Sequence, residues 1–343
     1  MSASSFARLS AAVSVLALCV ILLGAYVRLS DAGLGCPDWP GCYGHLVAPT
    51  SAPAIAAANE AHPARPVQSG KAWKEMVHRY LAGSLGLAIL ALAVIALRNR
   101  RQGLPVVLPT VLVLLVAFQA LLGMWTVTLL VNPAIVTAHL AGGMATLAVL
   151  WWLTLRQGGL RTAPIGVARQ SLRPWAILGL LLVVGQMLLG GWTSSNYAAL
   201  ACTEFPACHG GQWWPAADFA EGFRLWRPLG VDYEFGVLDS PARTAIHLAH
   251  RAGALVVTGY VGALGVSVIR SAASAAERRI GFALLAILCL QIALGITNVV
   301  AQLPLPVAVA HNGGAALLML ALLSLIHVST PRRVGAGAFE RRG

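Results

Sequence analysis

The sequence contains few charged residues. Asp, Glu, Lys and Arg make up 10% of its 343 residues, and only 12 residues are acidic. A soluble domain usually carries about 25% charged residues, so the composition argues against a soluble protein. Hydrophobic residues make up 58% of the chain. Several apolar stretches run about 20 residues, which is the length needed to span the hydrocarbon core of a bilayer.

The apolar stretches predict eight transmembrane helices. In lipid every backbone polar group must be hydrogen-bonded internally, so such stretches form helices. We expect them at about residues 10–29, 75–97, 105–128, 136–155, 174–193, 244–269, 279–300 and 307–328. No clean cleavage site follows the first stretch, so we expect it to be retained and not removed as a signal peptide. The sequence therefore predicts an all-α membrane protein.

The basic residues outnumber the acidic ones by 24 to 12, which gives a net charge of +12. Their distribution argues against a nucleic-acid partner, because the arginines cluster at the termini and in every second loop. These are Arg8; Arg98, Arg100 and Arg101; Arg156, Arg161, Arg169 and Arg173; Arg270, Arg278 and Arg279; and Arg332, Arg333, Arg341 and Arg342. The other loops hold most of the acids. This positive-inside pattern places both termini in the cytoplasm.

Cysteines are also few, and four of the six lie in pairs in the two long loops predicted to face outward, about residues 30–74 and 194–243. The pairs are Cys36 with Cys42, and Cys202 with Cys208. Outside the cytoplasm such pairs can oxidise and persist. A zinc site is the alternative, although five intervening residues is not a usual zinc spacing. We predict a disulfide in each loop, and we expect Cys19 and Cys289, inside helices, to act as small apolar residues.

The second half of the sequence repeats the first. At an offset of 166, Leu22-Leu23-Gly24 aligns with Leu188-Leu189-Gly190, and the cysteine pairs align with each other. After a six-residue insertion the offset becomes 172 and aligns His78-Arg79 with His250-Arg251, Gln119 with Gln291, Gly123 with Gly295, and His139 with His311. We therefore predict two tandem four-helix bundles related by a pseudo-two-fold axis along the membrane normal. Residues 1–160 form the N-terminal half, residues 170–330 the C-terminal half, and residues 331–343 a cytoplasmic tail.

Each half carries two histidines separated by 61 residues, namely His78 with His139 and His250 with His311. All four lie at a similar predicted depth near the outer surface. Ionisable residues inside a membrane are usually functional, although a single histidine often only bonds to a neighbouring helix. Two matched pairs favour axial ligation of heme iron, and bundle cores hold such cofactors. A zinc site would need three or four ligands, and no carboxylate or cysteine joins either pair.

Glu75 distinguishes the two halves. It precedes His78 by three residues and so shares its helical face, whereas the matching position in the second half is His247. A carboxylate beside a heme-type histidine in only one half favours proton transfer in catalysis. The alternative is a glutamate at a helix start that interacts with the helix dipole. His247 is either an extra ligand or, as we favour, a contact to the heme edge or to the loop above.

Four other polar residues are candidates by position. Arg79 and Arg251 each follow a predicted ligand, where they would either pair with heme propionates or extend to the membrane surface. Gln119 and Gln291 lie within helices, and we expect both to form interhelical hydrogen bonds.

Together these features resemble the heme A synthase family over nearly the whole chain. The resemblance is carried by the four histidines, the run Glu75-Met-Val-His78-Arg79, the segment Gly24-Ala-Tyr-Val-Arg-Leu-Ser, and the loop Gly35-Cys36-Pro37-Asp38-Trp39-Pro40-Gly41-Cys42. It implies an oxidoreductase of a bacterial inner membrane. Such an enzyme oxidises the C8 methyl of heme O to a formyl group and supplies heme A to terminal oxidases.

The resemblance also implies a role for each half. The C-terminal half would hold a permanent heme b through His250 and His311. The N-terminal half would receive the substrate heme O near His78 and His139, with Glu75 as the acid–base residue. Heme O would be handed over by heme O synthase, within the lipid, and an unidentified acceptor would take the electrons. The alternative functions are a diheme cytochrome b that oxidises quinol and a heme transporter.

Overall fold

The computed structural model describes residues 2–158, 167–272 and 274–330. These residues form helices and loops and no named strand; two isolated bridges lie in the cysteine loops, one of them joining Cys42 to His45. The prediction of an all-α protein is therefore confirmed. The predicted tail, residues 331–343, lies outside the described residues.

Eight helices within the described residues are long and apolar enough to cross a membrane. They are α1 (Ala3–Leu29), α3 (Ser69–Arg98), α4 (Val107–Thr128), α5 (Pro133–Gly158), α6 (Val167–Ser195), α8 (Ser240–Ser271), α9 (Ala275–Val300) and α10 (Leu305–Val328). Each overlaps one predicted span. The long loops also contain α2 (Ala52–Ala61) and α7 (Phe219–Gly222), and a 3-10 turn η1 (Arg100–Gln102) follows α3. The sequence did not predict these short elements.

The predicted helix starts were wrong for seven of the eight helices, which begin before the predicted residue. Hydrophobicity reports only the length of chain in lipid, whereas the helix continues into polar sequence until a cap ends it. Asp239 caps α8 by accepting a hydrogen bond from the backbone nitrogen of Ala242 at 3.0 Å. As a result, Glu75 and His78 lie about two turns into α3 and not in its first turn.

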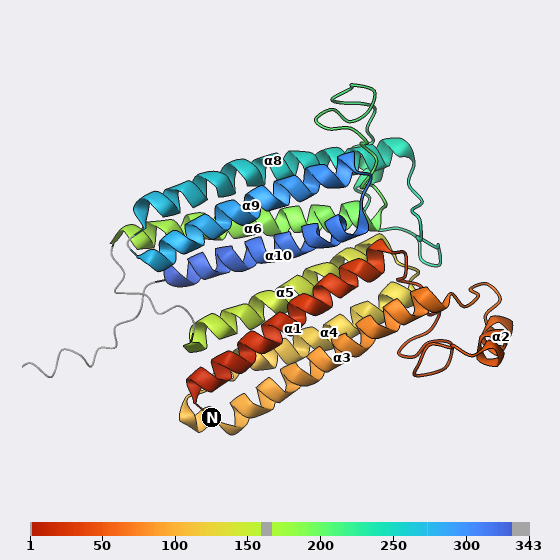
Figure 1. Cartoon of the computed structure of the whole chain (residues 1–343), viewed down its shortest axis with the longest axis horizontal. Coiled ribbons are helices and arrows are strands. Elements are labelled where there is room, and N and C mark those ends of the chain that lie inside the picture. The colour runs from red at the N-terminus through yellow and green to blue at the C-terminus, as the bar shows by residue number, and fades with distance from the viewer. Residues whose placement is uncertain (1, 159–166, 273, 331–343) are drawn as a thin grey trace, which may run out of the picture.

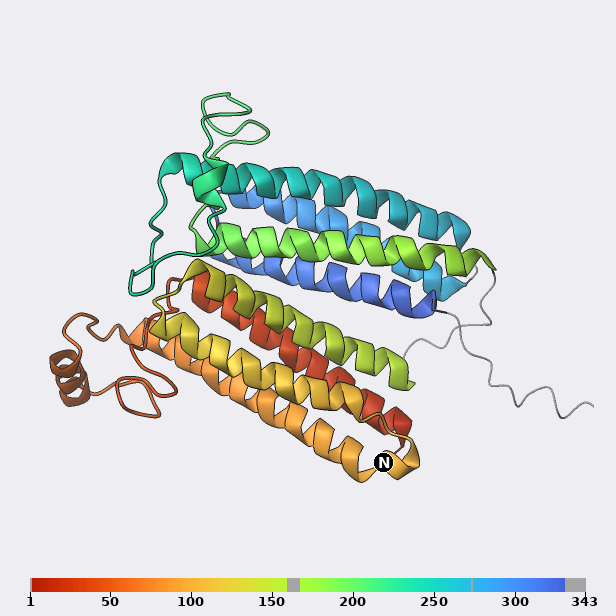
Figure 2. The ribbon, with the colours of Figure 1, turned by 180° about the vertical axis from the view of Figure 1, so that it is seen from behind.

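The helices form two four-helix bundles, one of α1, α3, α4 and α5 and the other of α6, α8, α9 and α10 (Figures 1 and 2). In the first bundle α3 and α5 both pack against α1 and α4, so they lie diagonally across the bundle. In the second, α8 and α10 both pack against α6 and α9. The bundles meet where α10 contacts α1 and α5, and where α5 contacts α6. The pseudo-two-fold axis stays a prediction, with which this packing order agrees.

Both long loops leave the bundles at the same end, as the two opposite views agree (Figures 1 and 2). The second loop crosses onto the first bundle. There Tyr233, which is 2% exposed, packs in a small apolar cluster with Leu34, Val127 and Val131. Its backbone nitrogen donates to the carbonyl of Leu130 at 3.1 Å. The second loop therefore completes the end of the N-terminal bundle at which both long loops lie.

Polar contacts also join the two halves near this end. Arg65 of the first loop forms ion pairs with Asp232 at 2.6 Å and Glu234 at 3.2 Å. Arg28, at the end of α1, donates to the carbonyl of Ser194 at 2.8 Å. These contacts fix the loops of one half on the other at the end where the histidines lie.

Candidate functional site

Each of the four predicted ligands lies against a glycine of the preceding long helix. A Cβ added to that glycine would stand 2.9–3.5 Å from the histidine Cε1. The pairs are Gly24 with His78, Gly123 with His139, Gly190 with His250, and Gly295 with His311. At Gly24, Gly190 and Gly295 a Cβ would press on the ring, and at Gly123 it would be in van der Waals contact with it. Each glycine therefore provides the seat in which an imidazole packs against backbone. The seat glycines lie on α1, α4, α6 and α9.

The predicted histidine pairs lie on the diagonally placed helices of each bundle. His78 of α3 and His139 of α5 each lie against a glycine of α1 or α4 in the first bundle, and His250 of α8 and His311 of α10 each lie against a glycine of α6 or α9 in the second. All four side chains are half-buried. The Nδ1 atoms of His78, His139 and His311 are buried without a hydrogen-bond partner.

This geometry fits axial ligation of a heme iron. Diagonal helices supply one imidazole each across a bundle core, where such cofactors are held. Buried ring nitrogens without protein partners fit groups that a bound ligand would satisfy. Among the described residues, no three His, Cys, Asp or Glu side chains gather as they would around a zinc ion. The arrangement therefore fits two ligands per site and not a cluster of three or four.

Glu75 lies in α3, is 5% exposed, and bonds to the loop of the first cysteine pair. Its Oε2 accepts a hydrogen bond from the backbone nitrogen of Cys36 at 2.9 Å, and its Oε1 accepts one from Nη2 of Arg79. A residue that merely interacts with the helix dipole would sit in the first turn. Glu75 is farther along and buried, so the helix-start interpretation is wrong.

His247, the counterpart of Glu75, contacts the loop above. Its Nδ1 lies 3.0 Å from the carbonyl oxygen of Ala198, and the side chain is buried. This agrees with one of the favoured interpretations. The two halves therefore use the same position to hold the long loop, one with a carboxylate and the other with an imidazole.

Both predicted disulfides are present. The S–S distances are 2.04 Å for Cys36–Cys42 and 1.99 Å for Cys202–Cys208. The first disulfide packs against Met76 of α3 and the second against Leu248 of α8. Each disulfide therefore lies on the helix that carries a histidine, two residues from that histidine in sequence. Cys19 and Cys289 are free thiols within α1 and α9, as expected.

The two arginines have a contact that the sequence analysis missed, because both bind the cysteine loops through backbone carbonyls. Arg79 donates to Asp38 at 3.0 Å, Pro40 at 3.2 Å and Gly41, and Arg251 donates to Glu204 at 2.7 Å, Pro206 at 3.3 Å and Ala207 at 2.8 Å. The acceptors in the two loops match at the offset of 166. This shared offset between the two loops was the sequence signal from which the contacts could have been predicted. Pairing of Arg79 and Arg251 with propionates stays a prediction.

An acid at the start of each cysteine loop holds the loop's turn. The Asp38 carboxylate accepts hydrogen bonds from the backbone nitrogens of Tyr43 and Gly44, both at 2.7 Å. Glu204 does the same for Gly210 at 2.9 Å and Gly211 at 3.1 Å. These two backbone hydrogen bonds hold the pKa of Glu204 below its usual value. The two cysteine loops therefore have the same internal hydrogen-bond pattern.

The glutamines differ from the prediction in part. Gln291 of α9 donates from Nε2 to the backbone carbonyl of His311 at 3.0 Å, which confirms an interhelical hydrogen bond. The Nε2 of Gln119 is buried without a partner, so the donor bond expected there is not formed. A third glutamine, Gln186 of α6, was missed by the sequence analysis. Its Nε2 lies 3.1 Å from Nδ1 of His250.

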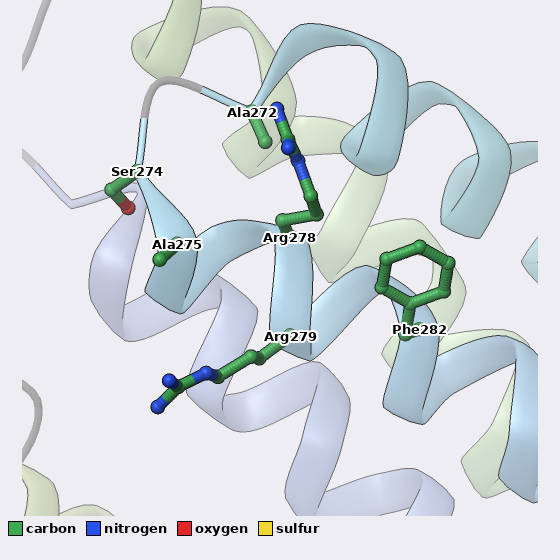
Figure 3. Close-up of a pocket in the computed structure, with 6 residues that line it drawn as sticks. All are labelled: Ala272, Ser274, Ala275, Arg278, Arg279 and Phe282. Carbon is green, nitrogen blue, oxygen red and sulfur yellow. The ribbon is translucent and has the colours of Figure 1, made fainter.

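A hollow of about 350 Å³ lies away from the histidines, at the turn between α8 and α9 (Figure 3). Its lining includes Arg278 and Arg279, whose side chains point in different directions in the close-up. From His250 to the end of α8 at Ser271 is ~30 Å at 1.5 Å per residue. This hollow is therefore no part of the histidine sites.

Comparison with known proteins identifies the family of the chain. Residues 7–323 match the family model COX15-CtaA, described as cytochrome oxidase assembly protein. The chain is 46% identical over 311 residues to heme A synthase of Shewanella oneidensis, covering 91% of this chain and 92% of that protein. It is 28% identical over 329 residues to heme A synthase of Caulobacter sp. strain K31, covering 90% and 91% of the two chains. The chain therefore belongs to the COX15-CtaA family of cytochrome oxidase assembly proteins.

Proposed function

We propose that the protein is a heme A synthase, which oxidises the C8 methyl of heme O to a formyl group. The observation that carries this proposal is Glu75. Its buried carboxylate lies one helical turn from His78, in one of the two paired histidine sites, and it bonds to the backbone of the first disulfide. A protein that only transferred electrons between two hemes would need no such carboxylate in one half alone.

The two histidine pairs have different roles in this proposal. His250 and His311 hold a permanent heme b, and His78 and His139 hold the iron of the substrate heme O. Bound heme b would supply one-electron redox chemistry. The glycine seats and the diagonal placement of the histidine helices support both assignments. Arg79 and Arg251 stay candidates for the propionates.

Glu75 acts as the acid–base residue. Conversion of a methyl to a formyl group removes protons and electrons and adds an oxygen atom, so a group must accept protons beside the substrate. The carboxylate of Glu75 is held in place by the Cys36 nitrogen on one oxygen and by Arg79 on the other. This arrangement keeps the proton acceptor at a fixed position on the face of α3 that carries His78.

The topology follows from the arginine pattern. The protein is a multi-pass protein of a bacterial inner membrane, with both termini and the α8–α9 turn in the cytoplasm and the cysteine loops outside. Residues 1–160 and 170–330 act as the substrate half and the heme b half. Heme O arrives through the lipid from heme O synthase. The cysteine loops thus cover the outer ends of both histidine sites.

The test is the heme profile of variants co-expressed with a source of heme O. Wild type should yield heme A and heme b after extraction and chromatography. Glu75→Gln should keep heme b, accumulate heme O and yield almost no heme A, because the amide cannot accept a proton. Glu60→Gln, which changes an exposed acid of α2 in the same way, is the matched control. Wild-type heme A in the Glu75 variant would rule out Glu75 as the acid–base residue. Absence of heme A in the wild type, with only heme b extracted, would favour a diheme electron-transfer protein instead.

A further inference from the structure

Three of the four histidine sites contain a second close contact between the same two helices. A glutamine stands four residues before the seat glycine, and its amide lies over a second glycine three residues after the histidine. These are Gln119 over Gly142, Gln186 over Gly253, and Gln291 over Gly314; a Cβ on the second glycine would stand 1.7, 2.2 and 2.1 Å from the amide. Any side chain on those glycines would displace the glutamine.

The fourth site, at His78, lacks this contact. The residue four before Gly24 is Val20, and the residue three after His78 is Leu81. Val20 is buried in the main apolar core, and Leu81 packs against that core. Two apolar side chains thus replace the amide and its glycine, so no polar side chain of α1 lies beside His78 at this position. The glutamine and the glycine are both replaced, which indicates that the whole contact differs at this site.

In the C-terminal half the amide reaches the histidine itself. Gln186 contacts both Nδ1 of His250 at 3.1 Å and its backbone carbonyl at 2.9 Å, while Gln291 donates to the backbone carbonyl of His311. The Oε1 atom of Gln186 is buried without a partner. When a histidine binds a metal through one ring nitrogen, the other carries a proton and needs an acceptor. A half-turn of the amide would bring Oε1 to that proton and would give up the hydrogen bond to the backbone carbonyl of His250.

We propose that Gln186 is a positioning residue that makes His250 a permanent heme ligand, and that Val20 and Leu81 leave His78 as an exchangeable one. The inference rests on the proposed function, in which one heme stays bound while the other enters and leaves. A ring held by an amide loses little rotational freedom when it binds iron, whereas an unheld ring loses more. The pair in which a glutamine bonds to each of the histidine-bearing helices therefore retains its heme, and the pair containing His78 releases it.

The first experiment compares Gln186→Leu and Gln186→Glu in the purified full-length protein. Gln186→Leu keeps the volume and removes the acceptor, so heme b should dissociate about 10- to 100-fold faster into a heme-scavenging apoprotein. Its midpoint potential should rise, because the ligand becomes less electron-donating. Gln186→Glu restores an acceptor, so heme retention should return and the potential should fall below wild type. A purely structural role for Gln186 would not produce this order of potentials.

Gln119→Leu is the matched control, because it removes the equivalent amide in the other half. Heme b dissociation and potential should equal those of wild type. Unchanged dissociation and potential in a folded Gln186→Leu protein would overturn the proposal. If that variant does not fold, Gln186→Met provides the same comparison with a more flexible side chain.

The second experiment builds the missing contact. In the double variant Val20→Gln with Leu81→Gly, the substrate half should retain more heme O or heme A through purification, and heme A output should fall, with heme b unchanged. Equal heme O and heme A content in the variant and wild type would contradict the role of Val20 and Leu81. His250→Ala distinguishes failure of the proposed heme b site from failure of the proposed role of Gln186. If His250→Ala keeps its heme b, the proposed heme b site fails; if it loses heme b while Gln186→Leu behaves as wild type, only this inference fails.

Discussion

The glycine seats act at the scale of single residues. Gly190→Ala should lower heme b content, because the new Cβ would stand 3.3 Å from Cε1 of His250 and the ring must shift. The matched control is Gly185→Ala on the same helix, where a Cβ meets nothing within 4 Å. Heme b per protein, from the reduced-minus-oxidised spectrum, decides the matter. Equal heme content in both variants would show that the seat tolerates a methyl group.

The same substitution in the first half should affect only the substrate heme and not heme b. Gly24→Ala places a Cβ 2.9 Å from Cε1 of His78, the closest approach at any of the four seats. We expect heme A formation to fall severalfold or more while heme b stays at the wild-type level. Gly83→Ala in α3, with nothing within 4 Å of the added Cβ, should form heme A normally. Loss of heme b in Gly24→Ala would mean that the sites are not independent.

The length of the Glu75 side chain also matters. Glu75→Asp keeps the charge but withdraws the carboxylate by one methylene from the Cys36 nitrogen, now 2.9 Å away. We expect reduced heme A formation, above that of Glu75→Gln, because a proton acceptor remains near its place. The extracted heme profiles of the two variants give the comparison. An inactive Asp variant would show that position matters as much as charge.

At the scale of elements, Arg79 and Arg251 each hold one cysteine loop. Arg251→Gln should make the Cys202–Cys208 disulfide more accessible to a water-soluble reductant, on the order of tenfold, because hydrogen bonds from a charged group are worth about 1.5–3 kcal/mol and partial exposure weakens them. Arg79→Gln should do the same to Cys36–Cys42 only. Timed alkylation and mass spectrometry measure both disulfides in one sample, so each variant is the control for the other. Equal reduction of both pairs would contradict local anchoring.

The turn held by Glu204 should depend on pH. Its pKa is lowered in the folded loop because the backbone nitrogens of Gly210 and Gly211 bond to the ionised carboxylate. The stabilisation is therefore complete above the unfolded pKa of about 4.3 and is lost as the pH falls through the lower folded value. Hydrogen exchange, corrected for intrinsic rates, should show reduced protection of residues 202–212 at that low pH. Glu204→Gln should remove the pH dependence.

The elements show what sequence can and cannot predict. Apolar length predicted all eight spans, and cysteine spacing with the arginine pattern predicted both disulfides. Helix starts were missed because caps such as Asp239 lie outside the apolar stretch. Gln186 was missed for a related reason: its repeat partner is Val20, so an alignment that seeks equal residues passes over it. The loop contacts of Arg79 and Arg251 depend on the folded path of segments about 40 residues away in sequence.

At the scale of the whole molecule, the second outer loop ties the two bundles together. Tyr233→Ala should lower the melting temperature of the detergent-solubilised protein by several degrees, because truncation of a large buried aromatic typically costs about 3–5 kcal/mol. Leu229→Ala, at a site 66% exposed on the same loop, should have little effect. Tryptophan fluorescence during heating provides the measurement. Identical melting of the two variants would mean that the cluster around Tyr233 contributes little to joining the halves.

The crossing of Tyr233 also orders events during synthesis of the chain. A ribosome completes α1, α3, α4 and α5 before it reaches residue 233, so the first bundle enters the membrane with the Leu34, Val127 and Val131 surface uncovered. That surface is closed only when the second long loop has been made and has folded back. Folding of the N-terminal half is therefore completed by the C-terminal half, and a chain truncated before residue 233 leaves this apolar patch uncovered.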